Sequence, residues 1–504
     1  MKIRQLTLSG SFSERATRHP WKTAGSLTIA TVASLLFAAT ASPAQTVIDI
    51  YNFTGQNSSA APSAVTPAQG RDGNLYGTTY GQGGTNYGTI FKTTTTGAFK
   101  QLYTFDSTTG SQPNAGLTLA SDGNFYGTSF SGGSAGFGVL FRISASGTYA
   151  VLHDFAGGAD GAAPASPPLE GGGDLYGTTY GNSTTSSTVY KFTRASGTFA
   201  TIYQFDQSYG SGVIASLIQA TDGNLYGTAY QGGANNCGSI FKLTTSGTLL
   251  WYYSFPCAPG GANPVGPLLQ GADGNFYGTT SQGGNPGVGT VFKLDNSGAV
   301  SILYNFRGFL GGASDGSTPF GGLVQATDGK LYGSTIAGGT QNVGTLFQIG
   351  TGGAYKLLYN FTNKGSSPSA APFQHTNGLL YGTTSQGGSL GFGVVYGLGM
   401  KLAPFVALVS YVGKAGGSVQ ILGQGFTGST GVTFNGVSAT SFSVLSDTYM
   451  TAVVPSGATT GFVAVTTPGG TLTSNKKFRI IGGTARAARA KSGEPISHAT
   501  KNTN

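Results

Sequence analysis

The sequence has few of the residues from which catalytic and metal sites are usually built. Charged residues make up only 9% of the 504 residues, and the chain contains four histidines and two cysteines. Between residues 45 and 475, Glu170 is the sole glutamate. Neither a phosphate-binding loop nor a His-Glu-x-x-His metal motif occurs. We therefore expect no catalytic residues, no metal site and no cofactor, which argues against an enzyme.

Long segments with helical periodicity are also missing after the N-terminus. Low charge and 86 glycines suggest a low-complexity chain, but 12% aromatic and 38% hydrophobic residues are too many for a disordered one. Glycine interspersed with Tyr, Phe, Thr and Val is instead typical of short strands joined by tight turns. The composition thus predicts an all-β fold.

The excess of positive over negative charge lies at the two ends of the chain. The formal net charge is +9, yet residues 45–475 hold fourteen basic and fifteen acidic residues. Because nucleic-acid binding needs a basic surface, we expect the folded body to bind no nucleic acid. Residues 481–504 are rich in Ala, Arg, Lys and polar residues, and this pattern predicts a disordered basic tail.

The N-terminus has the pattern of a signal peptide for export. A basic region precedes the apolar run Leu27–Ala39, and small residues follow at Ala41–Ala44. The run is shorter than the roughly 20 residues that a membrane-spanning helix needs, although a membrane anchor is the alternative. We expect residues 1–44 to be removed after Ala44. The mature chain would then have no membrane span and be secreted or held at the cell surface. The basic residues are Lys2, Arg4, Arg15, Arg18 and Lys22.

One element, Asp-Gly-Asn-Leu-Tyr-Gly-Thr-Thr with variations, occurs seven times. Its tyrosines follow one another at intervals of 50, 50, 50, 51, 55 and 49 residues, which indicates a repeat architecture. Within each unit, turn signals separate four short strands, as in one blade of a β-propeller. The tyrosines are Tyr76, Tyr126, Tyr176, Tyr226, Tyr277, Tyr332 and Tyr381.

The third and fourth strands of each unit are predicted to pair around a turn glycine. Phe91 and Tyr103 lie six residues on either side of Gly97, and most other units repeat this symmetry. The third unit has one extra residue, which predicts a bulge there. Cys237 and Cys257 each lie ten residues from Gly247, so the same register predicts a Cys237–Cys257 disulfide in an oxidising compartment.

The ends of the repeat region predict how it closes. The fourth-strand signature, aromatic-x-Phe, also occurs seven times, but its first copy precedes the first repeat and none follows the last. The strand Thr46–Phe53 would therefore complete the last unit near Val394–Gly397 and leave no open edge. We predict a seven-bladed β-propeller over residues 45–400. A linear solenoid or another number of blades is the alternative.

These motifs, such as Asp72–Thr79 and Gly88–Lys92, resemble the GloVer (Gloeo/Verruco) tandem repeats of exported bacterial proteins over about Thr46–Gly399. The resemblance implies no particular reaction. Residues 404–480 resemble an IPT/TIG domain, which implies a small immunoglobulin-like β-sandwich. Short alternating strands between turn signals independently predict such a sandwich there. The segments that carry the second resemblance are Val419–Phe426, Val432–Gly436, Val453–Pro455, Gly461–Val465 and Pro468–Gly470.

Few carboxylates or histidines are candidates for chemistry. The recurring Asp suits a turn with positive φ, because Gly172 and Asn377 take its place in two units. His153 occupies a strand position that is Tyr elsewhere, and His375 is isolated. Glu170 with Asp160 or Asp174 could form the carboxyl pair of a glycosidase, but no spacing requires it.

The loops between second and third strands carry the candidate binding residues. Amide groups beside aromatic rings suit a glycan or a polar protein surface, although the Gly-Gly pairs could simply form turns. We therefore expect an exported, non-enzymatic binding or surface-structural protein of undetermined oligomeric state; a carbohydrate-active enzyme, hydrolase or lyase, is the alternative. The candidate ligand-binding residues are Gln82, Tyr80, Phe130, Tyr180, Gln231, Tyr230, Gln282 and Gln386.

Overall fold

The computed structural model describes residues 46–55, 61–63, 65–83, 86–181, 186–308 and 315–481. The predicted signal peptide, residues 1–44, lies outside the described residues, as does the predicted tail after Ile481. The described chain is all-β except for a single 3-10 turn at Gly158–Asp160. None of its helices is long and apolar enough to cross a membrane.

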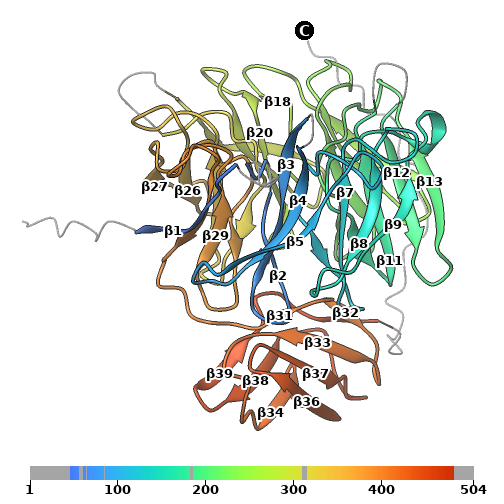
Figure 1. The fold of residues 1–504 in the computed structure, drawn as a ribbon, viewed down its shortest axis with the longest axis vertical. Coiled ribbons are helices and arrows are strands. Elements are labelled where there is room, and N and C mark those ends of the chain that lie inside the picture. The colour runs from blue at the N-terminus through green and yellow to red at the C-terminus, as the bar shows by residue number, and fades with distance from the viewer. Residues whose placement is uncertain are drawn as a thin grey trace, which may run out of the picture. The chain divides into compact units, whose positions relative to one another are not determined.

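The repeat region folds into four-stranded antiparallel sheets, and the described residues contain seven of them (Figure 1). Each of the first six sheets takes its strands consecutively from the chain, as the repeat period predicts. The first three consist of β2 (Ala68–Gln69), β3 (Leu75–Gly83), β4 (Asn86–Thr93), β5 (Phe99–Thr104); β6 (Thr118–Leu119), β7 (Phe125–Ser129), β8 (Val139–Ile143), β9 (Tyr149–Asp154); and β10 (Leu169–Gly171), β11 (Asp174–Thr179), β12 (Thr188–Thr193), β13 (Thr198–Gln204).

The next three sheets follow the same order, and a short pair of strands, β18 (Gly261–Ala262) and β21 (Gln282–Gly283), lies beside the fifth. Their strands are β14 (Ile218–Gln219), β15 (Leu225–Ala229), β16 (Ser239–Leu243), β17 (Leu249–Ser254); β19 (Leu269–Gln270), β20 (Phe276–Thr280), β22 (Thr290–Leu294), β23 (Val300–Asn305); and β24 (Val324–Gln325), β25 (Leu331–Thr335), β26 (Thr345–Ile349), β27 (Tyr355–Asn360).

The seventh sheet joins the two ends of the repeat region. It contains β28 (Phe373–Gln374), β29 (Leu380–Thr383), β30 (Val394–Leu398) and, as its outer strand, β1 (Val47–Asn52). β1 runs antiparallel to β30, with Val47 opposite Leu398 and Asn52 opposite Val394. Figure 1 shows the blue strand β1 and the orange β29 in the same sheet, in which β30 lies between them. This is the strand pairing that the offset of the aromatic-x-Phe signature predicts.

The predicted register of the third and fourth strands is wrong. Phe91 lies opposite Gln101, and it is Ile90 that lies opposite Tyr103. The hairpin is centred on Thr96 rather than on Gly97, because Thr93 pairs with Phe99, and a bulge follows between Ile90 and Phe91. Bulges occur in the corresponding hairpins of the first six sheets, not in the third alone. A bulge puts two residues opposite one, so counting equal steps from a turn overshoots.

Neighbouring sheets are joined by one hydrogen bond that recurs seven times. A Thr or Ser hydroxyl of the second strand donates to a backbone carbonyl that precedes the first strand of the next sheet. Thr383 of the seventh sheet donates to Val65 before the first, at 2.6 Å, in the same manner as the others. The remaining bonds are Thr78–Ala115 (2.5 Å), Thr128–Ser166 (2.9 Å), Thr178–Ala215 (3.1 Å), Thr228–Gly266 (3.1 Å), Thr279–Gly321 (2.8 Å) and Ser334–Ala370 (2.9 Å).

Aromatic side chains fill the space between neighbouring sheets. The fourth-strand aromatic of one sheet stacks on the first aromatic of the next sheet's fourth strand, as Tyr103 does on Tyr149 at 3.9 Å between ring centroids. His153 takes the tyrosine position and stacks on Phe199 at 3.6 Å. Tyr51 of β1 makes the same contact with Phe99 at 4.1 Å. His153 is therefore a packed residue of the repeat.

Two fully buried tyrosines are expected to destabilise the repeat region. The Tyr190 and Tyr396 hydroxyls have no hydrogen-bonding partner among the described residues, and five other repeats have Phe at this position. Because an unpaired buried hydroxyl costs about 1–3 kcal/mol, Tyr190→Phe and Tyr396→Phe should each raise the free energy of unfolding in urea by about 1 kcal/mol. As a control, Tyr76→Phe should lower it, since the Tyr76 hydroxyl donates to Asp72 at 2.8 Å. A loss of stability in the first two variants would contradict the expectation.

The C-terminal region forms two further four-stranded antiparallel sheets around one apolar core. The core includes Val406, Ile421, Phe434, Val463 and Phe478, each at most 1% exposed. The first sheet has the order β31 (Ala407–Leu408), β33 (Ser418–Leu422), β37 (Tyr449–Val453), β36 (Ser441–Ser446), and the second has β35 (Val437–Ser438), β34 (Gly431–Phe434), β38 (Val463–Thr467), β39 (Gly470–Thr473); β32 (Val412–Gly413) pairs in parallel with β40 (Arg479–Ile480).

Candidate functional site

Each repeat sheet has two chemically different ends. The Asp-Gly turns join the first strand to the second, and the Gln-Gly-Gly loops join the second to the third. Because adjacent strands are antiparallel, these two connections lie at opposite ends of the sheet. We call the first end the turn face and the second the loop face.

Three predicted glutamines are exposed on the loop face. Gln231, Gln282 and Gln386 form no side-chain hydrogen bond to the part of the chain that the structure describes, although their backbones are held. Gln231 exchanges backbone hydrogen bonds with Ser211, and Gln386 with Ser366. Gln82 lies at the end of β3, but its side chain is outside the description. The loop face thus offers free amide groups on fixed backbone positions.

Three of the four aromatic candidates lie near one another, and two of the glutamines have no aromatic residue beside them in the sequence. Tyr80, Phe130, Tyr180 and Tyr230 are half-buried. The rings of Phe130 and Tyr180 are 6.5 Å apart, and a Cβ at Gly212 would lie within 3.5 Å of both Tyr180 and Tyr230. Ser281 and Ser385 take the aromatic position beside Gln282 and Gln386. The predicted set therefore divides into an aromatic group on the first four sheets and isolated glutamines elsewhere.

The Gly-Gly pairs of these loops are required by the backbone. Gly232 and Gly233 have φ of +77° and +74°. A Cβ at Gly232 would lie 2.7 Å from the Gln207 carbonyl oxygen, which is too close. Only glycine adopts this conformation without strain and leaves that space free. These glycines form the turn.

The recurring Asp of the turn face holds the recurring Tyr. The turn has the predicted positive φ, which falls on the glycine after the Asp, as at Gly73 (+72°). Asp72 accepts hydrogen bonds from the Asn74 backbone at 3.2 Å and from the Tyr76 hydroxyl at 2.8 Å. The Tyr76 side chain is fully buried. An Asp in a short turn commonly bonds to the backbone two residues on, and here it also satisfies a buried hydroxyl.

These Asp residues are expected to make the protein sensitive to acid. Burial raises the pKa of Asp222, but hydrogen bonds from Asn224, Lys242 and Tyr226 outweigh it and lower the pKa from 3.8 to about 2. The pKa values of Asp72, Asp122 and Asp273 are also lowered. A lowered pKa in the folded state stabilises the protein above the ordinary value, and this contribution is lost as pH falls through the folded value.

Thermal unfolding should therefore show a constant midpoint near neutral pH that falls steeply between about pH 4 and pH 2. Asp222→Asn should lower the midpoint at neutral pH and make the acid fall shallower. A variant with the same acid dependence as the unchanged protein would show that the turn Asp residues are not responsible.

Glu170 belongs to a polar network rather than to a carboxyl pair. Its carboxylate accepts a hydrogen bond from the Ser121 backbone at 2.9 Å and forms an ion pair with Arg194. Arg194 also lies 3.4 Å from Asp122. Glu170 and Arg194 are largely buried, with side chains 9% and 15% exposed. A glycosidase acid needs a second carboxyl group across the substrate bond, and the two that were considered are each engaged with another residue.

Asp160 contacts His153 at 3.1 Å, and Asp174 contacts Lys191 at 2.8 Å. His375 is 1% exposed and bonds to the Gly73 carbonyl at 3.0 Å. Burial lowers the pKa of His375, so it is neutral at physiological pH and donates this bond. No group of three or more His, Cys, Asp or Glu residues in the described ranges could hold a metal ion.

The two cysteines form the predicted disulfide. Cys237 and Cys257 are bonded, with their Cα atoms 5.4 Å apart. Cys237 lies just before β16, and Cys257 follows the end of β17. The bond therefore links the two ends of the hairpin on the loop face.

The C-terminal sheets contact the turn face. Thr448 donates to the Arg71 carbonyl at 2.7 Å, and Gln424 donates to Thr376 at 2.9 Å. The Arg71 guanidinium lies 4.7 Å from the centre of the Tyr449 ring. Arg71 follows the first strand of the first sheet, and Thr376 that of the seventh. These contacts involve the turn face and leave the loop glutamines exposed.

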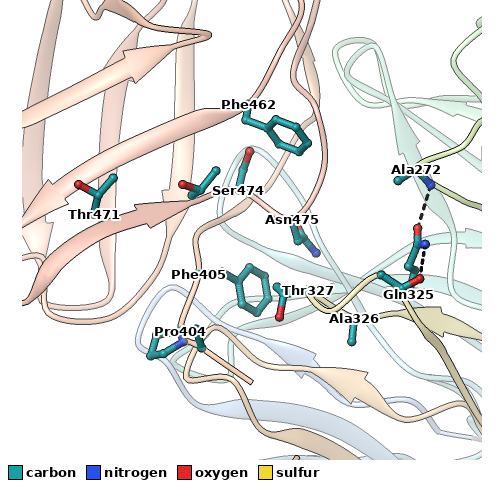
Figure 2. A pocket seen from close by; sticks show the side chains of 13 residues that line it. Ala272, Gln325, Ala326, Thr327, Pro404, Phe405, Phe462, Thr471, Ser474 and Asn475 are labelled. Atoms are coloured by element: carbon teal, nitrogen blue, oxygen red, sulfur yellow. Dashed lines mark hydrogen bonds between the residues drawn. The ribbon is translucent and has the colours of Figure 1, made fainter. Parts of the chain in front are cut away.

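A cleft of about 480 Å³ lies where the C-terminal region meets the turn face of the fifth and sixth sheets (Figure 2). Residues from distant parts of the sequence line it. They are Ala272, Gln325, Ala326, Thr327, Gly329, Ala403, Pro404, Phe405, Phe462, Thr471, Thr473, Ser474 and Asn475. No repeated motif marks these residues, so sequence reasoning could not bring them together. The Asp-Gly motifs predict the turns themselves, but nothing in them predicts that the C-terminal region contacts these turns.

Comparison with known proteins adds a family and distant structural likenesses. None of the curated protein sequences matches the chain. The extracellular domain of a protein described as a hybrid two-component system from B. thetaiotaomicron is 12% identical, with a TM-score of 0.48. That match covers 76% of this chain but only 46% of the other chain.

The periplasmic gluconolactonase of Pseudomonas aeruginosa is 18% identical, with a TM-score of 0.43 over 64% of this chain and 95% of the other. Hydrazine synthase of Kuenenia stuttgartiensis is 13% identical, with a TM-score of 0.45 over 64% and 93%. These proteins differ in activity, and such distant likenesses do not indicate what this chain does.

The profile of the Gloeobacter/Verrucomicrobia repeat matches residues 33–187 and 159–314. Together these matches span residues 33–314, which is more than half of the 504 residues. They cover the first five copies of the repeated tyrosine element, and the remaining two sheets have the same strand order. The all-β chain therefore belongs to the Gloeobacter/Verrucomicrobia repeat family.

Proposed function

We propose that this chain is an exported, non-enzymatic binding protein whose loop face recognises a neutral extracellular glycan. The observation that carries the proposal is the set of exposed, unbonded glutamine side chains on fixed backbone, with Gln231 directly after the half-buried Tyr230. Neutral amides and aromatic rings suit sugar hydroxyls and the apolar faces of sugar rings. A polar protein surface is the competing ligand for the same groups.

A closed ring of seven blades would display this face. Three contacts support closure between the seventh and first sheets: the β1–β30 pairing, the Thr383–Val65 hydrogen bond, and a bond from the Thr376 backbone to Gln69 at 3.1 Å. The same kind of bond, from a turn backbone to a glutamine side chain, occurs between other neighbouring sheets. There the acceptors are Gln270, Gln325 and Gln374, each bonded to the turn of the preceding sheet at 2.8–3.0 Å. Because the hydroxyl bond recurs at all seven junctions, the junction between the seventh and first sheets would need no contact of its own kind.

The C-terminal region would act as an immunoglobulin-like domain of the IPT/TIG type. Its two antiparallel sheets over one core support this. Since it contacts the turn face, we propose that it holds the ring from one side and leaves the other for ligand. Export is supported by the basic and apolar N-terminal pattern and by the disulfide, which persists in oxidising compartments.

Glycan binding should be tested with an array and then by calorimetry on a bound glycan. Replacing Gln82, Gln231, Gln282 and Gln386 by Ala should weaken binding by about tenfold or more, since each neutral hydrogen bond contributes about 0.5–1.5 kcal/mol. Gln204→Ala is the matched control, because Gln204 is exposed on the outer strand β13. Unchanged affinity in the fourfold variant would exclude the loop face.

The same samples should be assayed for polysaccharide cleavage. We expect no turnover, because the carboxylates considered for catalysis are held in ion pairs. Turnover that Glu170→Gln abolishes would overturn the binding-protein proposal. Binding of a protein partner but of no glycan would replace the proposed ligand.

A further inference from the structure

The cleft between the turn face and the C-terminal region has the groups of a second binding site. Its volume of about 480 Å³ falls within the range of small-molecule sites. None of its thirteen lining residues is charged. Phe405 is buried at its edge, whereas the Phe462 ring remains 42% exposed. Figure 2 shows the Asn475 amide between Phe462 on one side and Phe405 and Thr327 on the other.

The orientation of the Asn475 amide is determined by its neighbours. The Tyr411 hydroxyl accepts a hydrogen bond from the Leu408 backbone at 3.2 Å, so its own hydrogen is free to be donated. It donates to Asn475 Oδ1 at 2.7 Å. The Asn475 oxygen is thereby engaged, and the Nδ2 amino group has no partner among the described residues. A donor fixed beside an exposed aromatic ring is ready for a ligand oxygen.

Hydroxyl groups extend this polar side of the cleft. Thr327 accepts from Gln374 Nε2 at 3.0 Å, which leaves its hydroxyl hydrogen for a ligand. Thr471 and Thr473 are exposed in β39, and their hydroxyls make no hydrogen bond within the described chain. The cleft therefore combines one aromatic platform with several uncharged donors and acceptors.

These features select among ligand classes. None of the lining side chains is charged, and the Lys477 ammonium lies outside the lining, 6.0 Å from the centre of the Phe462 ring. Burying a charged ligand among the uncharged lining groups would be unfavourable. An extended peptide could add to the edge of β39, but Val406 already donates to the Thr473 carbonyl at 3.3 Å and occupies that edge. A sugar ring presents an apolar face of C–H groups and several hydroxyls, and both features match the lining.

We propose that this cleft binds a neutral sugar ring, stacked on Phe462, with a sugar oxygen accepting from Asn475 Nδ2. The site lies on the turn face and is separate from the loop-face site, so it does not depend on the function proposed above. A chain with both sites could hold two glycan segments at once.

The test is calorimetry and saturation-transfer NMR on the full secreted chain. The probes are methyl β-glucoside, methyl β-N-acetylglucosaminide and the acidic sugar galacturonate. We expect the neutral probes to bind and galacturonate to bind less well. Phe462→Ala and Asn475→Asp should each weaken neutral-sugar binding by about tenfold; the Asp variant keeps the oxygen that Tyr411 needs and removes the donor.

Matched variants keep the result interpretable. Leu445→Ala removes another exposed apolar side chain of the C-terminal region, 60% exposed, and should leave binding unchanged. Gln204→Ala removes an exposed amide of the repeat region, on β13, and should also leave binding unchanged. The proposal is overturned if no neutral probe binds, if galacturonate binds best, or if Phe462→Ala leaves the binding unchanged.

Discussion

Deleting residues 47–54 is expected to lower the thermal midpoint more than any single substitution in the repeat region. The deletion removes β1, the outer strand of the seventh sheet, and exposes the edge of β30. It also removes Phe53, which is fully buried with Leu75, Phe91, Tyr381 and Val395. These neighbours come from the first and seventh sheets, so their packing would be lost at the junction between the two ends.

A point variant separates the packing effect from the strand itself. Phe53→Ala should cost about 3–5 kcal/mol of unfolding free energy, as for other large-to-small changes in a core. Phe155→Ala is the matched control, because Phe155 is the equivalent fully buried residue of the second sheet. If the junction resembles the others, both variants should cost a similar amount in urea denaturation. A deletion variant with an unchanged midpoint would show that β1 contributes nothing to the stability of the repeat region.

Arg194→Ala is expected to destabilise the protein by about 3 kcal/mol, because it leaves two carboxylates without their cation. Glu170 is largely buried, and it also accepts from the Ser121 backbone at 2.9 Å. Removing one partner of a buried ion pair costs more than removing both. The loss should appear in urea denaturation at neutral pH and shrink as the pH is lowered and the carboxylates become protonated.

A second change should largely restore this stability. Glu170 occupies the strand position that is Gln in other sheets, where Gln270 accepts from the Thr221 backbone at 2.9 Å. In Arg194→Ala combined with Glu170→Gln, the amide oxygen can still accept from Ser121 while the unpaired charge is gone. We expect the double variant to regain most of the lost free energy. If it is no more stable than Arg194→Ala, packing of the Arg194 side chain rather than charge explains the loss.

The strand order was predictable because it depends on short-range signals that recur. Each unit carries its own turn residues and alternating strands, so a strand that is ambiguous in one unit can be assigned by comparison with the other six. The β1–β30 pairing was predictable because the aromatic-x-Phe signature is displaced by one strand relative to the tyrosine element. The register of the third and fourth strands was not predictable, since a bulge leaves the spacing of aromatic residues in the sequence unchanged.

The roles of polar residues were harder to predict than the strands. The recurring Asp gave a turn signal, but its bond to the Tyr hydroxyl four residues on depends on side-chain directions within the turn. Glu170 stood out as an isolated carboxylate, yet its partner Arg194 comes from a different hairpin of the same sheet. The cleft around Phe462 includes residues more than 130 positions away from it in the sequence, and no local sequence pattern predicts such a contact.

The seven hydroxyl bonds between neighbouring sheets give the repeat region a redundancy that bears on how its copies diverge. Every unit carries both the donor for its successor and the carbonyl for its predecessor, so no single junction depends on a unique residue. A unit can therefore differ from the others at its remaining positions and still keep its contacts with both neighbours. The third unit differs at three recurring positions: it has Gly172 for the turn Asp, Glu170 for Gln and Tyr190 for Phe. It still donates from Thr178 at 3.1 Å, and its Arg194 pairs with the carboxylate that takes the place of the amide.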